Sequence, residues 1–375
     1  MQTTCRRYFL RQALKGGAAA LSLGLLPFSN HSSYVLRARP AKEALFYQKL
    51  EGNTVQCRLC PNVCMISAGQ SGFCRVRKNI GGRLHSMVYG RPCTIDVGPI
   101  EKAPLFHFLP GHQRLCVATV GCNLRCLYCQ NWHISQKGPG EVKEWNMSAQ
   151  GIVEEARRRG VNSISFTYSE PTVFYEYVYD ISKLARERGV KTSIVSNGYI
   201  NPQPLRDLLP YLDAVKIDLK GFSEEFYREV SSARLEPVLQ TLKVLQEEKA
   251  HFEIVNLVVP TLNDDPAVIE KMCLWIKGHL GEDTPLHFSR FHPTYRLTNL
   301  PATPVRTLDA AIRIARDTGL RYVYIGNVPG HRHNSTYCPR CEERLIHRVH
   351  FSVLRNNLAQ GRCKFCGHRI HGIWE

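Results

Sequence analysis

Residues 120–132 read VGCNLRCLYCQNW and carry three cysteines, Cys122, Cys126 and Cys129, in a C-x3-C-x2-C spacing. Three thiolates on one short loop can wrap around one corner of a cubane iron–sulfur cluster. A [4Fe–4S] cluster held by protein alone takes four cysteines, so here one iron is expected to stay open. An open coordination position separates a reactive metal centre from a structural one. The alternatives are a zinc knuckle and an electron-transfer cluster, and both usually take a fourth protein ligand.

The cysteine loop follows the first of several short, β-branched runs, and amphipathic helical patterns lie between these runs. Such alternation predicts right-handed βαβ units and a parallel sheet. We therefore expect an α/β fold built on a partial (βα)6-type, TIM-like barrel over residues 114–330. The expected strands are 115–121, 163–170, 191–197, 214–220, 252–260, 286–293 and 322–327, and the expected helices lie near 148–159, 173–188, 235–249, 266–280 and 307–318.

Polar residues stand where several of these strands end. They are Glu170, Asn197, Asp218, Lys220 and His292. Active sites of α/β barrels lie at the carboxyl ends of the strands, so these side chains are candidates for a site beside the cysteine loop. Local explanations remain open: Glu170 could stabilise a helix N-terminus, Asn197 could serve a turn, and Asp218 could pair with Lys220.

The ordered motifs along the chain resemble those of the radical S-adenosylmethionine superfamily. Within it, the chain is similar to the AmmeMemoRadiSam-system enzymes, relatives of pyruvate formate-lyase activating enzyme. The resemblance extends from about residue 45 to the C-terminus. Besides the cysteine loop it rests on CRLCPNVC (57–64), GFCRVR (72–77), GPIEKAPLFHFLPG (98–111), FTYSEPTVFYEY (166–177), SNGYI (196–200), DLKGFSEEFYR (218–228), LEPVL (235–239), HFSRFHP (287–293) and GNVPGH (326–331).

The resemblance implies a [4Fe–4S] cluster and S-adenosylmethionine as cofactors. The amino and carboxylate groups of S-adenosylmethionine would fill the open iron, and an electron would break its sulfonium bond to the 5′ carbon. The resulting 5′-deoxyadenosyl radical would abstract hydrogen from a substrate. A low-potential electron donor is required. The substrate stays open between a protein, as for activases that make glycyl radicals, and a small molecule, and the sequence names no catalytic residue.

The resemblance also suggests which residues touch S-adenosylmethionine. The GGEP-like motif that holds the methionine amino group appears here as YSEP (168–171) without its glycines, which leaves Glu170 or the backbone as the contact. The SNG segment faces the methionine or ribose, the end of the fourth strand touches cofactor or substrate, and residues 256–260 follow the adenine. The expected cofactor-binding residues are Glu170, Ser196, Asn197, Asp218, Lys220 and Asn256.

A second cysteine group lies in the tail, residues 331–375. Cys338 and Cys341 form one C-x2-C pair, and Cys363 and Cys366 form another about twenty residues later. Two such pairs offer four thiolates in a tetrahedron, which predicts a zinc-ribbon-like domain. Iron in a rubredoxin-like site would use the same spacing.

A third group, Cys57, Cys60, Cys64 and Cys74, has a less regular spacing. It could bind zinc or a second cluster, or consist of free thiols. Gly and Pro punctuate the surrounding residues 41–113, so we expect a small Cys-rich cap domain without regular layers. The remaining residues Cys5, Cys93, Cys116 and Cys273 are expected to be small apolar residues rather than ligands.

Residues 1–40 resemble a twin-arginine leader. CRRYFLR (5–11) contains the paired arginines, and a mild apolar stretch follows at 18–26. Export would suit a folded, cofactor-loaded enzyme, but S-adenosylmethionine is made in the cytosol and no A-x-A cleavage site follows. Both locations, cytoplasmic and exported, stay open. No run is long enough for an ordinary transmembrane helix.

The composition is basic, and it contains enough apolar residues to form a hydrophobic core. Hydrophobic residues make up 43% of the 375 residues, and 49 Lys and Arg against 32 Asp and Glu give a net charge of +17. A basic surface can attract nucleic acid, yet the charge is spread along the chain, and the tail has neither an aromatic platform nor a helix-turn-helix pattern. We therefore expect no nucleic-acid partner. A nucleic-acid-modifying radical enzyme and a non-catalytic metal-binding scaffold remain the competing functions.

Overall fold

An eight-stranded sheet organises residues 41–375, which are the part of the chain that the computed structural model describes. Its strand order is β14-β13-β12-β11-β10-β9-β8-β7, and all neighbours from β8 to β14 are parallel. The sheet therefore has the predicted mostly parallel α/β architecture, with seven parallel strands in place of six and two open edges. Its strands are β7 Thr94–Pro99, β8 Gln113–Ala118, β9 Ser163–Phe166, β10 Lys191–Ser196, β11 Ala214–Asp218, β12 Phe252–Val258, β13 Leu286–Arg290 and β14 Val323–Gly326.

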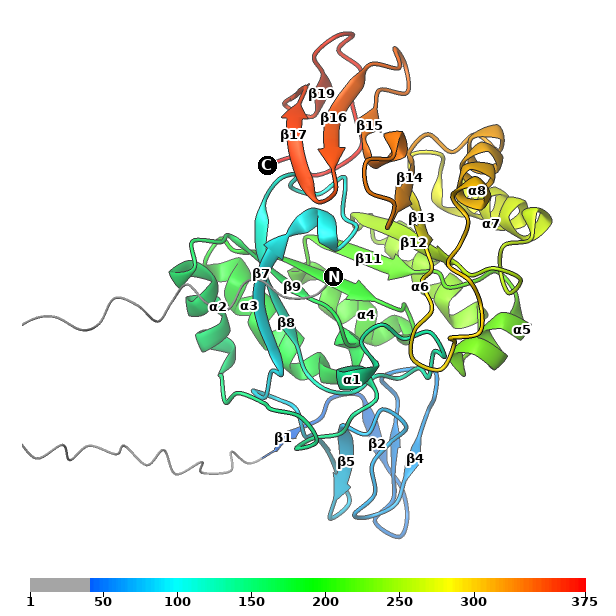
Figure 1. The fold of residues 1–375 in the computed structure, drawn as a ribbon. Helices are drawn as coiled ribbons and strands as arrows, with labels where there is room; N and C mark the ends of the chain where they lie inside the picture. The colour runs from blue at the N-terminus through cyan, green and yellow to red at the C-terminus, as the bar shows by residue number, and fades with distance from the viewer. Residues whose placement is uncertain (1–40) are drawn as a thin grey trace, which may run out of the picture. The chain divides into compact units, whose positions relative to one another are not determined.

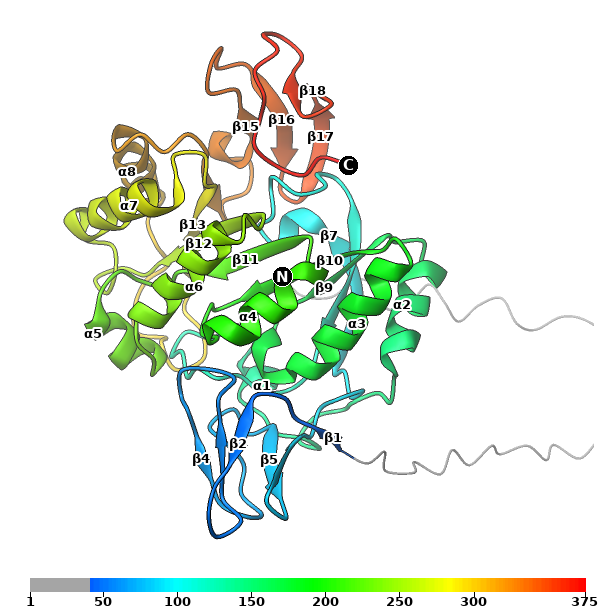
Figure 2. The same ribbon diagram turned by 180° about the vertical axis from the view of Figure 1, so that it is seen from behind.

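Helices between the parallel strands cover one face of this sheet, as the two opposite views show for α2, α3, α4 and α6 (Figures 1 and 2). Their ends carry ordinary signals: Asp265 caps the longest helix by accepting hydrogen bonds from the backbone of Ala267 and Val268, and Pro266 follows at the first helical position. The helices are α1 Trp132–Ser135, α2 Ala149–Arg158, α3 Tyr175–Glu187, α4 Pro202–Leu208, α5 Glu224–Phe226, α6 Glu236–Glu247, α7 Pro266–Leu280 and α8 Val305–Asp317.

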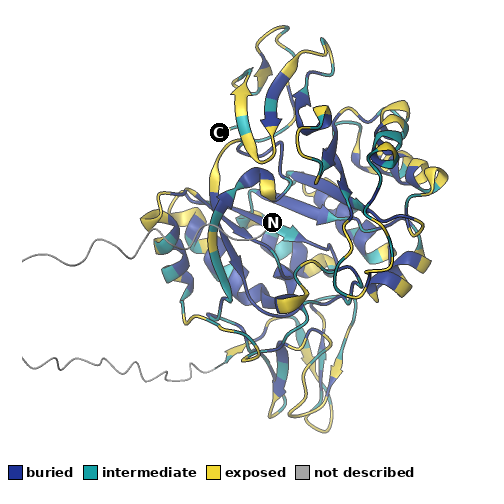
Figure 3. Cartoon of the chain, viewed as in Figure 1, coloured by how far each residue is buried: buried dark blue, intermediate teal, exposed yellow. Residues whose placement is uncertain are grey.

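The parallel strands are buried on both faces, which the colouring in Figure 3 makes visible. One face is apolar, with residues such as Ile164, Phe166 and Phe288 in the main hydrophobic core. The opposite face carries polar groups at the same depth, among them Lys216 and His287. Successive side chains of a strand alternate between faces, so a buried strand can supply core and site at once.

Residues before the sheet form two small three-stranded sheets, in contrast to the expected cap without regular layers. Their strands have two to four residues each, too short to show a periodic pattern. The expected boundary at residue 113 also differs from the structure, because β7 pairs antiparallel with β8 and belongs to the main sheet. These cap strands are β1 Lys42–Glu43, β2 Tyr47–Lys49, β3 Val55–Cys57, β4 Met65–Ile66, β5 Arg77–Ile80 and β6 Arg83–Ser86.

The tail folds as short strands at the end of the unit opposite the cap (Figures 1 and 2). Buried Arg348 joins it to the chain before β8: its guanidinium donates to the Phe106 carbonyl at 2.7 Å and lies 4.2 Å from the centre of the Phe106 ring. Together, cap, sheet and tail make one contact unit, Ala41–Glu375. The strands are β15 Thr336–Tyr337, β16 Arg344–Val349, β17 Ser352–Asn356, β18 Leu358–Ala359 and β19 Arg362–Cys363.

Two sequence predictions bear on membranes and export. Among the described residues, every helix is too short or too polar to cross a bilayer. The leader-like segment, with Cys5, lies outside the described residues.

Candidate functional site

The cysteine loop and the carboxyl ends of the strands open onto one cavity of about 530 Å³. This volume lies in the range of small-molecule and cofactor sites. Two expected residues, Ser196 and Asn256, do not line it, and His292 is exposed outside it. The expected residues that do line it are Cys122, Cys126, Cys129, Glu170, Asn197, Asp218 and Lys220.

Backbone contacts hold the cysteine loop in place. The N–H groups of Arg125 and Leu127 donate to the carbonyls of Ser231 and Val230 at 3.0 and 2.9 Å. The loop begins at Gly121, whose φ of 98° favours glycine. A Cβ at Gly121 would come within 2.9 Å of the Cys74 carbonyl oxygen in the cap. The glycine therefore allows the cap and the start of the loop to meet closely.

Hydrogen-bond donors surround the thiols of the loop. The Leu124 N–H lies 3.4 Å from Cys122 Sγ, and the Asn197 amide lies 3.7 Å from the same sulfur. Cys129 Sγ and Ser135 Oγ are 3.1 Å apart. Burial raises the pKa of the Cys122 thiol well above its ordinary value. Such a buried group becomes a thiolate when a metal displaces its proton, and donors to the sulfur then stabilise the negative charge.

Glu170 is buried and has both carboxylate oxygens engaged. Oε1 accepts from the Thr172 N–H at 3.0 Å and from Ser196 Oγ at 2.7 Å, and Oε2 accepts from the Asn197 N–H at 2.9 Å. Burial raises the pKa of Glu170, and these donors partly offset that effect. Ser196 thus contacts the site through Glu170. The local explanation at this position also holds, because Glu170 caps a 3-10 turn, Pro171–Phe174.

Three charged side chains on β11 and its end form a cluster inside the cavity. Asp218 pairs with Lys216 and, at 3.3 Å, with Lys220. Burial lowers the pKa of Lys216, although the Asp218 carboxylate opposes this. The sequence analysis missed Lys216. Its spacing of two residues from Asp218 would have revealed it, because residues at i and i+2 of a strand share a face.

Asn256 has a structural contact in place of a cavity position. Its side-chain amide donates to the Leu219 carbonyl at 2.8 Å, and its neighbours Val255 and Leu257 line the cavity. Strand alternation places Asn256 on the other face of β12. Asn256 therefore faces away from the cavity, and its expected contact with the cofactor stays a prediction.

The cavity also holds buried polar atoms that have no hydrogen-bond partner within the described residues. Nearly all buried polar groups in proteins are paired, so unpaired atoms facing a cavity indicate where a ligand can bind. The sequence analysis named none of them as a site residue, although Ser169 lies in the YSEP motif and Tyr128 lies in the cysteine loop. They are Glu101 Oε2, Arg114 Nη1, Tyr128 OH, Ser169 Oγ and Asn334 Oδ1.

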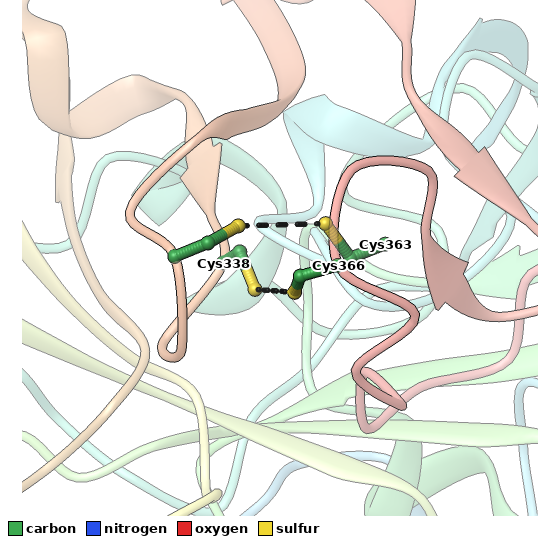
Figure 4. Close-up of side chains that lie close together, drawn as sticks. Cys338, Cys363 and Cys366 are labelled. Atoms are coloured by element: carbon green, nitrogen blue, oxygen red, sulfur yellow. Dashed lines mark hydrogen bonds between the residues drawn. The ribbon is translucent and has the colours of Figure 1, made fainter.

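The four tail cysteines converge as predicted (Figure 4). Cys338 Sγ lies 3.6 Å from Cys366 Sγ, and Cys341 Sγ lies 3.7 Å from Cys363 Sγ. These separations are too long for disulfides, whose sulfurs are about 2.05 Å apart. Tetrahedral zinc with Zn–S bonds of about 2.3 Å requires sulfurs about 3.8 Å apart. The tail thiols therefore have the geometry of a single-ion site.

The four cap cysteines also come together, around a second and much smaller cavity. Of the cysteines expected to be apolar packing residues, Cys116 and Cys273 are fully buried and Cys93 is half-buried.

The site belongs to an α/β enzyme that places three loop thiols above the strand ends of a parallel sheet. Residues 116–272 match the Radical SAM superfamily. An uncharacterised protein of Methanocaldococcus jannaschii is 47% identical over 331 residues, which cover 88% of this chain and 98% of that protein. The chain therefore belongs to the radical SAM superfamily, and the predicted class of enzyme is confirmed.

Two further relatives are named as activating enzymes. The pyruvate formate-lyase-activating enzyme of Clostridium pasteurianum is 26% identical over 51% of this chain and 78% of that enzyme. The (2S)-3-sulfopropanediol dehydratase activating enzyme of Klebsiella oxytoca is 27% identical over 37% of this chain, and the match spans about half of that enzyme, 47%.

Proposed function

We propose that this chain binds a [4Fe–4S] cluster and S-adenosylmethionine in the 530 Å³ cavity and acts on a substrate that enters the same cavity. One observation carries the proposal: three thiols and the polar strand ends line a single cavity. When bound, the cofactors supply a 5′-deoxyadenosyl radical that abstracts hydrogen. The protein's own task is to hold, orient and shield the reactants.

Different residues of the cavity perform different parts of this task. Cys122, Cys126 and Cys129 supply three thiolates and leave one iron for the amino acid end of S-adenosylmethionine. Glu170 is held by three donors and can accept one more hydrogen bond, from an ammonium group. Burial opposes the charged form of Lys220, but the Asp218 carboxylate and, after it, Cys126 raise the pKa of Lys220 well above its ordinary value. The positive charge of Lys220 can therefore offset the negative charge of a thiolate at Cys126.

A protein substrate is favoured by the named activating enzymes among the relatives. In this version the chain abstracts hydrogen from a glycine of a partner, and a low-potential donor provides the electron. The test is electron paramagnetic resonance of candidate partners after incubation with the enzyme, S-adenosylmethionine and reductant. A glycyl radical signal supports a protein substrate, and its absence with radical transfer to a small molecule contradicts it.

For the tail we propose a structural zinc ion on Cys338, Cys341, Cys363 and Cys366. The tetrahedral spacing of the sulfurs supports a single ion. Metal analysis of the purified protein separates zinc from iron at this position.

The experiment that tests the main proposal is anaerobic reconstitution with iron and sulfide, followed by dithionite and S-adenosylmethionine. We expect formation of 5′-deoxyadenosine and methionine, and loss of both to background in C126A. C273A is the matched control, because Cys273 is a buried cysteine of α7 outside all three groups. A reconstituted cluster whose spectrum ignores added S-adenosylmethionine would contradict the proposal.

A further inference from the structure

Three arginine side chains of the described residues are fully buried, and they differ in how their charge is balanced. Arg77 pairs with buried Glu176 at 2.8 Å, and Arg348 lies 3.5 Å from buried Glu101. Arg114 is 1% exposed, and it has no ion pair within the part of the chain that the structure describes. Burying a charge without a partner is costly, so the position of Arg114 requires a reason other than stability.

Among the described residues, the Arg114 guanidinium bonds through only one of its three nitrogens. Its Nε donates to the Pro99 carbonyl at 3.4 Å, a long contact between β8 and β7, and its unpaired Nη1 belongs to a side chain that lines the 530 Å³ cavity. Burial lowers its pKa, and the Cys116, Tyr168 and Glu101 side chains oppose that effect. A planar guanidinium with a free edge fits two oxygens of a carboxylate or a phosphate.

Arg114 lies far along its strand from the cysteine loop. β8 extends from Gln113 to Ala118, so four steps of about 3.3 Å separate the Arg114 backbone from Ala118 by about 13 Å, and the loop follows only after Ala118. The amino acid end of S-adenosylmethionine needs the open iron beside that loop. The Arg114 guanidinium is therefore better placed for a second ligand than for this end of the cofactor.

The wall near Arg114 also offers hydrogen-bond acceptors. Glu101 lies in the 3-10 turn Ile100–Lys102 after β7, and its Oε1 accepts from the Gly111 N–H at 2.8 Å. Glu101 Oε2 and Asn334 Oδ1 both line the cavity without a partner among the described residues. A ligand whose anionic group binds Arg114 can therefore donate a hydrogen bond from a hydroxyl, amine or amide group to Glu101.

Tyr168 places a strained residue in the wall of the same cavity. Its φ of 67° lies in the left-handed region, which favours glycine and which bulky side chains rarely adopt. The ammonium group of exposed Lys102 lies 5.9 Å from the centre of the Tyr168 ring, and both residues line the cavity. Strained residues of this kind cluster at ligand-binding sites. Lys102 adds a second positive charge to this side of the cavity.

We propose that Arg114 binds the carboxylate or phosphate group of an anionic substrate. Glu101 orients this substrate by accepting one of its hydrogen bonds, and the charge of Lys102 attracts it. A small acid and an acidic side chain of a partner protein present the same oxygens to Arg114. The identification of the anion as the substrate of the radical reaction rests on the function proposed above, whereas the binding of an anion by Arg114 does not.

The first test asks whether Arg114 serves stability. R114M replaces the guanidinium by an apolar side chain, and R77M makes the same change at a paired arginine. In chloride buffer we expect the urea midpoint of R114M to equal or exceed that of the wild type, because an unpaired buried charge is removed. R77M should have a lower midpoint, because Glu176 loses its partner. A fall in R114M as large as that in R77M would assign Arg114 to the stability of the fold and overturn the proposal.

The second test measures anion binding by the reconstituted full chain. Acetate, inorganic phosphate or a blocked peptide of glycine and aspartate is added, with chloride keeping the ionic strength constant. We expect at least one of them to raise the thermal midpoint of the wild type by about 2 °C or more, and to raise that of R114M no more than chloride does. Stabilisation by acetate or phosphate would indicate a small substrate, and stabilisation by the peptide alone a protein substrate. Equal shifts in the wild type and R114M, or no shift, would contradict the proposal.

The third test separates the substrate from the cofactor. The affinity for S-adenosylmethionine is measured by titration of the electron paramagnetic resonance signal of the reduced cluster, and we expect similar values in the wild type and R114M. A loss of about tenfold or more in R114M would place Arg114 in the cofactor site and overturn the proposal. If the wild-type protein makes no 5′-deoxyadenosine, the function proposed above fails, and the thermal shifts still decide whether Arg114 binds an anion.

Discussion

The cap and the tail each bring four cysteines together, but they do so in different ways. In the tail, two C-x2-C turns face each other, and all four sulfurs lie within 4.8 Å. In the cap, four cysteines from β3, the turns after it and the segment before β5 line a small cavity together with the buried Arg77. Both groups begin with the same local C-x2-C pair. The same local pair is therefore completed by a second C-x2-C pair in the tail and by two separately placed cysteines in the cap.

The two regions also differ in what they contact. The cap donates one hydrogen bond to the catalytic loop, from the Asn62 amide to the Asn123 carbonyl. In the tail, the Arg348 guanidinium donates to the Phe106 carbonyl, which precedes β8. The ring of His107, also before β8, is hydrogen-bonded to the His371 carbonyl of the tail and to the Tyr324 hydroxyl of β14. From this difference we expect the cap to support the position of the catalytic loop and the tail to contribute to stability.

The largest expected effect follows from removing a tail ligand. Binding of structural zinc contributes about 10–16 kcal/mol at pH 7, and much of this is folding free energy. C338A should lose its zinc and become sensitive to proteases within residues 331–375, while the iron content stays the same. Metal analysis and limited proteolysis measure both, with C273A as the control. A protease-resistant tail without metal would show that packing alone holds it.

A smaller effect is expected beneath the cap. E176Q leaves the Arg77 guanidinium buried without its counter-charge, and breaking such a pair costs about 3–5 kcal/mol. The free energy of unfolding in urea measures the loss. The matched control is E248Q, since the exposed pair of Arg206 and Glu248 is worth about 0–1 kcal/mol. A loss of unfolding free energy smaller than that of E248Q would mean that the buried Arg77 guanidinium does not need the negative charge of Glu176.

The stability that the contacts between the tail and the main sheet contribute should depend on pH. Burial lowers the pKa of His107 to about 3, from its ordinary 6.5, and its ring bonds the His371 carbonyl and the Tyr324 hydroxyl. Between these values only the unfolded chain takes up the proton, so stability falls as the pH is lowered below 6.5. The expected loss is about 1.4 kcal/mol per pH unit.

This pH effect is isolated by comparing wild type with H107Q in urea unfolding at pH 7, 6 and 5. The variant cannot bind that proton, so its stability should fall less steeply, although both proteins share the other histidines. Parallel slopes would show that His107 does not titrate in this way.

The smallest effect concerns the contact between cap and catalytic loop. N62A removes one hydrogen bond to the Asn123 carbonyl, worth about 0.5–1.5 kcal/mol. Hydrogen exchange should become faster within residues 120–132. N201A is the matched control, because the Asn201 amide also bonds the cap, at the Arg58 carbonyl, without touching the loop. Equal exchange rates of residues 120–132 in both variants would show that the Asn62 hydrogen bond does not stabilise the loop.

The alternation of strands and helices could be predicted from the sequence because it depends on residues that are neighbours in the chain. The helix expected at 266–280 is Pro266–Leu280, and the seven expected strands agree with β8 to β14 to within a few residues. β7 was missed, since an antiparallel edge strand needs no following helix and TIDVGP contains Gly and Pro. The open cavity atoms of Glu101 and Arg114 were also missed, because only the folded chain shows which polar groups are left without partners.

By itself the sequence determined the class of this protein: the cysteine loop, the order of its elements and the presence of three thiol groups all follow from neighbouring residues. The tertiary structure decided how those thiols are used. It brought the tail sulfurs to single-ion distance, gathered the cap cysteines around a small cavity and turned Asn256 away from the larger one. The physical reason is that ligand type is a property of one residue, whereas coordination depends on distances between residues that only packing sets.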